Sequence, residues 1–81
     1  MTDKTLRDVF MEIVVTQLET GDPPETKATL DRLIALGHTR EEAMQLIAAV
    51  ARKEMQAMIV AAREFDNARY ADLLARLPTL D

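Results

Sequence analysis

The sequence predicts an all-α protein with four helices packed around a long third one, and three observations support this fold class. Residues 39–63 contain no glycine or proline and are rich in Ala, Met, Leu, Glu, Gln, Arg and Lys, which lose little freedom in a helix. Apolar side chains elsewhere recur three and four residues apart. Start and stop signals separate these segments. We expect one domain, residues 1–81, with helices at about 3–19, 23–36, 40–63 and 67–77.

The first helix is predicted by one apolar face and by the glycine that follows it. The side chains on this face are Leu6, Val9, Phe10, Ile13, Val14 and Leu18. Gly21 is a natural stop, because glycine readily adopts the left-handed conformation that ends many helices.

The second helix begins at a strong start signal. Asp22 is placed to cap it, two prolines follow where no N–H group is needed, and Glu25 completes a capping box. Gly37 is expected to end the helix. The side chains expected to face inward are Leu30, Leu33 and Ile34.

The third and fourth helices each begin with a capping residue. Thr39 and Glu42 form a second capping box at the start of the long helix. Asp66 is the expected cap of the last helix, with Phe65 packing on Tyr70 as a hydrophobic staple. The inner face of that helix comprises Tyr70, Leu73, Leu74 and Leu77, and Pro78 closes it.

Composition narrows the classes of function. The net charge is −4 with acids and bases interspersed, which argues against a nucleic-acid or anionic-membrane surface. The longest apolar run, residues 55–62, is broken by Gln56 and is far too short to span a bilayer. The N-terminus does not resemble a signal peptide. We therefore expect a cytoplasmic protein that binds neither nucleic acid nor membrane.

A homodimer is expected from the size of the core and the face of the long helix. A single core in 81 residues is marginal unless disulfides, a metal or a partner subunit support it, and the chain has no cysteine. The third helix is apolar over an arc wider than the roughly 100° that one core requires. The simpler alternative is that the other three helices of the same chain cover this arc. The residues assigned to the interface are Met11, Val15, Leu18, Met44, Met55 and Met58.

Glu54 is the anomaly of the third helix because its carboxylate falls inside the apolar arc. A buried carboxylate must be paired, hydrogen-bonded or protonated. Gln17 lies similarly on the apolar face of the first helix. One interpretation is a polar site of Glu54, Gln17 and Tyr70 that holds a ligand or metal. The favoured interpretation is that Glu54 is structural. Its carboxylate then either bonds to Gln17, Tyr70 or an arginine, or reaches the rim of the core.

No enzymatic chemistry is predicted. The chain has one histidine, His38, and neither serine nor cysteine. Zinc motifs and glycine-rich phosphate loops are absent from the sequence, so we expect no metal, no cofactor and no catalytic residue. The remaining acids are explained as helix caps and helix-dipole partners.

Two resemblances accompany these patterns. Leu36-Gly37-His38 and the helix start after it resemble, locally, the Met-Gly-Phe turn of a ubiquitin-associated domain. Over most of the chain, four segments and the C-terminal stretch follow one another in an order that resembles a family of small uncharacterised bacterial all-helical proteins, a domain-of-unknown-function family. This resemblance implies a bacterial, cytosolic setting and carries no activity. The matching segments are residues 14–18, 22–26, 29–33 and 37–43, and the ending is 65–78.

The sequence favours a non-enzymatic, homodimeric helical module that serves as an interaction or structural protein. Another protein is a second candidate partner. The alternative is a ligand- or metal-binding helical bundle that uses Glu54 and Gln17. A ubiquitin-like adaptor ranks third.

Overall fold

The computed structural model describes residues 5–80, and within them the chain forms four helices and no strand. These are α1 (Leu6–Thr20), α2 (Pro24–Ala35), α3 (Arg40–Ala61) and α4 (Asn67–Ala75). The predicted all-α fold with a long third helix is therefore confirmed. Part of the predicted first helix, residues 3 and 4, lies outside the described residues.

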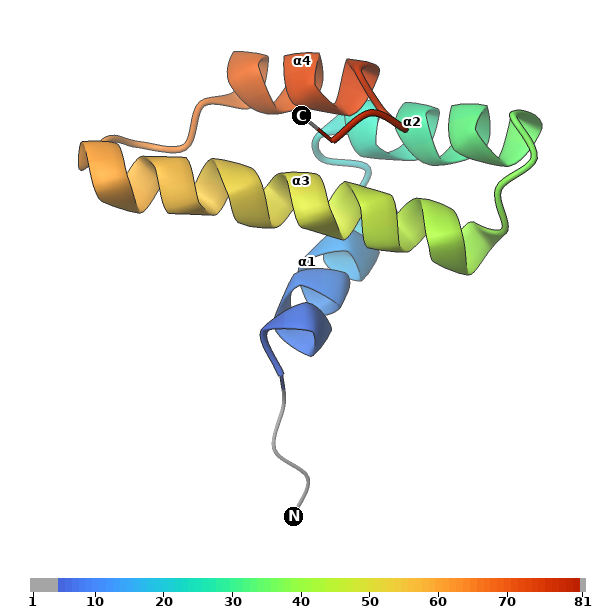
Figure 1. The fold of residues 1–81 in the computed structure, drawn as a ribbon, viewed down its shortest axis with the longest axis horizontal. Helices are drawn as coiled ribbons and strands as arrows, with labels where there is room; N and C mark the ends of the chain where they lie inside the picture. The colour runs from blue at the N-terminus through green and yellow to red at the C-terminus, as the bar shows by residue number, and fades with distance from the viewer. Residues whose placement is uncertain (1–4, 81) are drawn as a thin grey trace.

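The long helix α3 runs through the middle of the molecule, and the others lie on either side of it (Figure 1). α2 and α4 run alongside it on one side, whereas α1 crosses it steeply on the other. Beyond α1, the last turns of α3 are accompanied only by the loop that leads to α4. The first turns of α1 likewise project from the body of the molecule.

One apolar core joins the four helices. Its members come from every element. All four side chains predicted for the inner face of the last helix are buried, although Leu77 follows the end of α4. Ala48 and Ala51 of α3 are buried, and such small side chains let a crossing helix approach closely. The buried apolar residues are Phe10, Val14, Leu30, Leu33, Ala43, Ile47, Ala48, Val50, Ala51, Tyr70, Leu73, Leu74 and Leu77.

Three side chains predicted to face inward are exposed instead. Leu6 is 60% exposed, Val9 39% and Ile34 41%. Because α1 crosses α3 rather than running along it, its first turns lie outside the core, whereas the part of α1 from Phe10 onward reaches it. Periodicity identifies an apolar face, but the crossing angle decides how much of that face is covered.

The capping predictions are mostly confirmed. Thr39 and Glu42 form the predicted capping box, and Asp66 caps α4. Gly21 has a φ of 71° and ends α1. α1 also begins with a capping box that was not predicted, in which Thr5 and Asp8 bond to each other's backbone N–H.

The predicted cap at Asp22 is wrong. α2 begins at Pro24, its N-cap is Pro23, and no side chain caps it. Pro23 precedes another proline, and a residue in that position is driven out of the helical region into extended backbone. Its φ and ψ of −78° and 152° agree with this explanation.

The ends of the last three helices were predicted slightly too late. α2 ends at Ala35 rather than residue 36, and α4 at Ala75 rather than 77, close to Pro78. α3 ends at Ala61 rather than 63 because Ala62 adopts a left-handed conformation with a φ of 52°. No helix within residues 5–80 has both the length and the apolar character needed to cross a membrane.

Candidate functional site

The carboxylate of Glu54 is fully buried and held by two arginines. Arg63 Nη2 donates to both carboxylate oxygens, at 2.9 and 3.0 Å. Arg69 Nε lies 3.0 Å from Glu54 Oε1. Glu54 has no exposed surface, whereas the side chains of Arg63 and Arg69 are 31% and 47% exposed. Glu54 is thus a paired carboxylate, as the favoured interpretation of the sequence required.

The end of α3 and the start of α4 place the two guanidinium groups. The left-handed Ala62 ends the helix, and the backbone N–H of Arg63 then bonds to the carbonyl of Met58. This reversal returns Arg63 toward Glu54, two turns back along α3. Asp66 starts α4 so that Arg69 falls in its first turn. The hydrogen bond to Glu54 raises the pKa of Arg63 above its ordinary value.

A second polar cluster joins α1, α2 and α4. The side-chain oxygen of Gln17 accepts hydrogen bonds from the hydroxyl groups of Thr26 and Tyr70, both at 2.9 Å. Thr26 and Tyr70 have no exposed surface. Burial raises the pKa of the Tyr70 hydroxyl above its ordinary value, and the bonds to Thr26 and Gln17 only partly offset this. Phe65 covers the Tyr70 ring edge-on, with the ring centroids 5.3 Å apart.

The residues predicted to form one polar site therefore belong to two clusters. Glu54 bonds to Arg63 and Arg69, whereas Gln17 and Tyr70 bond to each other, and no hydrogen bond joins the two sets. Every buried side-chain nitrogen and oxygen within residues 5–80 has a partner. In the same part of the chain, no group of three or more His, Asp or Glu side chains is placed to hold a metal ion. Each cluster is therefore a structural link between parts of the chain.

The residues predicted for an interface are spread over several surfaces. Four of them, Met11, Leu18, Met44 and Met55, are partly buried and pack against the chain's own core. Val15, Leu18 and Met44 line a shallow groove between α1 and the start of α3. Met58 is half-buried more than three turns farther along α3. Two of the six, Met55 and Met58, lie in the last turns of α3.

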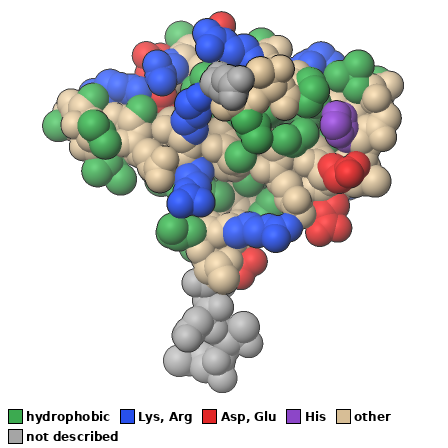
Figure 2. Space-filling view, in the orientation of Figure 1, with side chains coloured by type: hydrophobic (Ala, Val, Ile, Leu, Met, Phe, Trp, Pro, Cys, Tyr) green, Lys and Arg blue, Asp and Glu red, His purple; other side chains and the backbone are tan. Residues whose placement is uncertain are grey.

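The most exposed apolar surface lies at the end of α3. We call residues 55–62 the α3 tip. Within it, Ile59 is 75% exposed and Val60 87% exposed, and apolar side chains cover this end of the molecule in Figure 2. The sequence analysis assigned two residues of this segment, Met55 and Met58, to the interface, but it did not single out Ile59 and Val60. Periodicity could not show that neighbouring helices stop short of it.

Comparison of the chain with protein-family models, with curated proteins and with solved structures gives no significant match. The resemblance to small bacterial all-helical proteins therefore stays a prediction.

We predict that Glu54→Gln lowers the free energy of unfolding by about 2 kcal/mol, because the two partly exposed guanidinium groups lose their hydrogen bonds to a charged acceptor. Chemical denaturation of both proteins at one concentration measures the difference. Asp72→Asn is the matched control, since Asp72 forms an exposed ion pair with Arg76 at 2.7 Å, and such pairs contribute less than about 1 kcal/mol. Unchanged or increased stability of Glu54→Gln would contradict the pairing.

We predict that Tyr70→Phe lowers the free energy of unfolding by about 1 kcal/mol at neutral pH, because the Gln17 oxygen loses one donor. The pKa of Tyr70 is raised in the folded chain. Its contribution is therefore complete below the ordinary pKa of about 10 and is lost as pH rises through the folded-state value. The difference between wild type and variant should shrink above that pH. A difference that stays constant from neutral to strongly alkaline pH would rule out a buried, hydrogen-bonded hydroxyl.

Proposed function

We propose that the protein is a non-enzymatic helical module of the cytoplasm that acts as a homodimer, in an interaction or structural role. The observation that supports this proposal is the α3 tip. A helix that is apolar on all sides is normally buried, yet Ile59 and Val60 are largely exposed here. Exposed apolar surface concentrated in this way marks an interaction site.

A second copy of the chain is the partner that this surface fits. Residues 55–62 contain no charged side chain, so two copies can meet there without bringing like charges together, although each copy has a net charge of −4. In a two-fold dimer the same patch on each subunit covers the other. The core of an 81-residue chain gains most from such burial, because a core of this size is marginal alone.

The exposed start of α1 adds further apolar surface. Leu6 and Val9 are 60% and 39% exposed on the turns of α1 that project from the body. The alternative function, a ligand- or metal-binding bundle around Glu54 and Gln17, has less support. The carboxylate of Glu54 and the side-chain oxygen of Gln17 already accept hydrogen bonds from the chain's own donors.

We predict that wild-type protein sediments as a dimer at micromolar concentration and that Ile59→Lys weakens the dimer at least about 100-fold, because each subunit would bury an unpaired ammonium group. Leu36→Lys is the matched control, since Leu36 is 60% exposed at the end of α2, away from the α3 tip. It should leave the dimer intact. Sedimentation equilibrium measures all three.

Two outcomes would contradict the proposal. One is a compact wild-type monomer over the whole micromolar range. The other is a dimer that Ile59→Lys and Leu36→Lys weaken equally, which would place the interface elsewhere. Circular dichroism of both variants shows that they keep the helical fold, because both positions are exposed in the single chain.

A further inference from the structure

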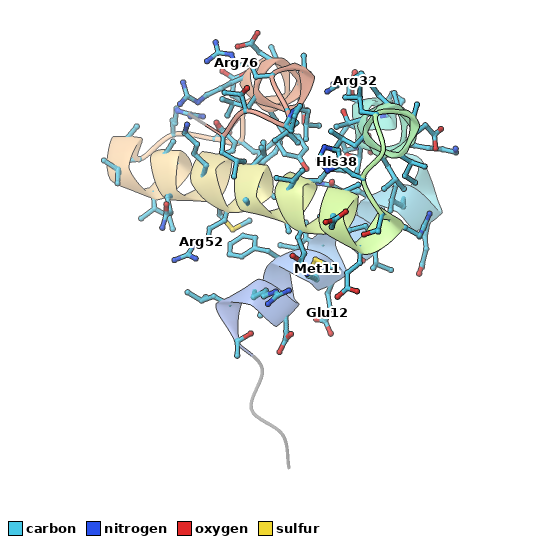
Figure 3. All side chains as sticks on the ribbon, turned by 45° about the vertical axis from the view of Figure 1, so that its right-hand side comes forward. Met11, Glu12, Arg32, His38, Arg52 and Arg76 are labelled. Atoms are coloured by element: carbon cyan, nitrogen blue, oxygen red, sulfur yellow. The ribbon has the colours of Figure 1, made fainter. Side chains whose placement is uncertain are left out.

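A pocket lies where α1 crosses the middle of α3, and it belongs to neither polar cluster nor the α3 tip. Its volume is about 270 Å³. In Figure 3, Met11 lies between α1 and α3, and Arg52 extends outward from α3 to the left of it. We call it the crossing pocket, and the residues that line it are Arg7, Phe10, Met11, Gln45, Ala48, Ala49 and Arg52.

The floor of the crossing pocket is apolar. Phe10 and Ala48 are only 8% and 6% exposed, and Met11 packs against the core beside them. Ala48 and Ala49 have the shortest side chains on this part of α3, which leaves room above the helix backbone. A short hydrocarbon group could bury its surface here with little rearrangement of the pocket side chains.

The rim of the crossing pocket carries two arginines from different helices. Arg7 of α1 and Arg52 of α3 are both exposed, and neither forms an ion pair or hydrogen bond with a residue of the described range 5–80. By contrast, Arg32, Arg63 and Arg69 bind backbone carbonyls or Glu54. On the face shown in Figure 2, basic side chains lie where α1 meets α3, with acidic side chains beside them. Two cations that face one pocket attract an anion into it.

We propose that the crossing pocket binds a small amphipathic carboxylate, with its hydrocarbon part on the floor and its carboxylate between Arg7 and Arg52. The guanidinium group matches a carboxylate with two parallel hydrogen bonds. The volume lies just below the roughly 300 Å³ of the smallest drug-sized sites, so the hydrocarbon part must be short. Gln45 completes the rim, although its amide nitrogen already donates to Glu41 at 3.5 Å.

The proposal is independent of the homodimer, because Arg7, Arg52 and the pocket floor lie within one chain and outside residues 55–62. The test is a titration of the full chain with sodium octanoate, followed by amide NMR. We expect saturable shifts at Met11, Gln45 and Ala49. Arg52→Gln and Arg7→Gln should each weaken binding about tenfold or more, as expected for a lost charge-assisted hydrogen bond.

Three control measurements separate this site from other modes of binding. Arg76→Gln removes an exposed arginine that directly follows α4 and should leave octanoate affinity unchanged. Ala49→Leu fills the pocket from an exposed position and should abolish binding while the helical spectrum is retained. Octanol and inorganic phosphate, which supply the hydrocarbon chain and the anion separately, should both bind at least about tenfold more weakly than octanoate.

The proposal is overturned by any of four results. The first is that octanoate produces no saturable shift. The second is that Arg52→Gln leaves the affinity for octanoate unchanged. The third is that octanol or phosphate binds as tightly as octanoate. The fourth is a set of shifts centred on Ile59 and Val60, which would mean adsorption to the α3 tip.

Discussion

The buried carboxylate of Glu54 is the constraint on which the second half of the structure depends. A carboxylate without exposed surface must be compensated, and Arg63 and Arg69 do so from the residues that follow α3. To reach it, the chain reverses at Ala62 in a left-handed conformation that costs an alanine roughly 1–2 kcal/mol. The two arginines offset this cost. They thereby fix where α3 ends and where α4 begins.

The reversal at Ala62 also explains why the α3 tip stays exposed although the other helices share one small core. With α4 returned alongside α3, Tyr70 and the leucines of α4 fill the core, and Tyr70 reaches Gln17. The loop after Ala62 follows only one side of the α3 tip, and α1 crosses α3 farther back. Ile59 and Val60 therefore stay exposed. The proposed self-association through the α3 tip would complete the burial that a single chain leaves unfinished.

Local features of the sequence predicted most of the fold. The four helices, the caps at Thr39 and Asp66, and the contact between Phe65 and Tyr70 follow from neighbouring residues alone. Glu54 was identified as anomalous because its neighbours on the helix face are apolar. Its partners could not be identified, because Arg63 and Arg69 approach only after the reversal at Ala62, and alanine carries no sequence signal for a left-handed residue. The exposure of Leu6 and Val9 depends on the angle at which α1 crosses α3, which periodicity does not contain.

The central claim is that the α3 tip of one chain lies against that of another. A mixed sample of isotope-labelled and unlabelled protein tests this most directly through isotope-filtered nuclear Overhauser effects between chains. The account predicts intermolecular contacts from the methyl groups of Ile59 and Val60. A dimer whose intermolecular contacts all lie elsewhere, or a sample with no such contacts at millimolar concentration, would contradict it.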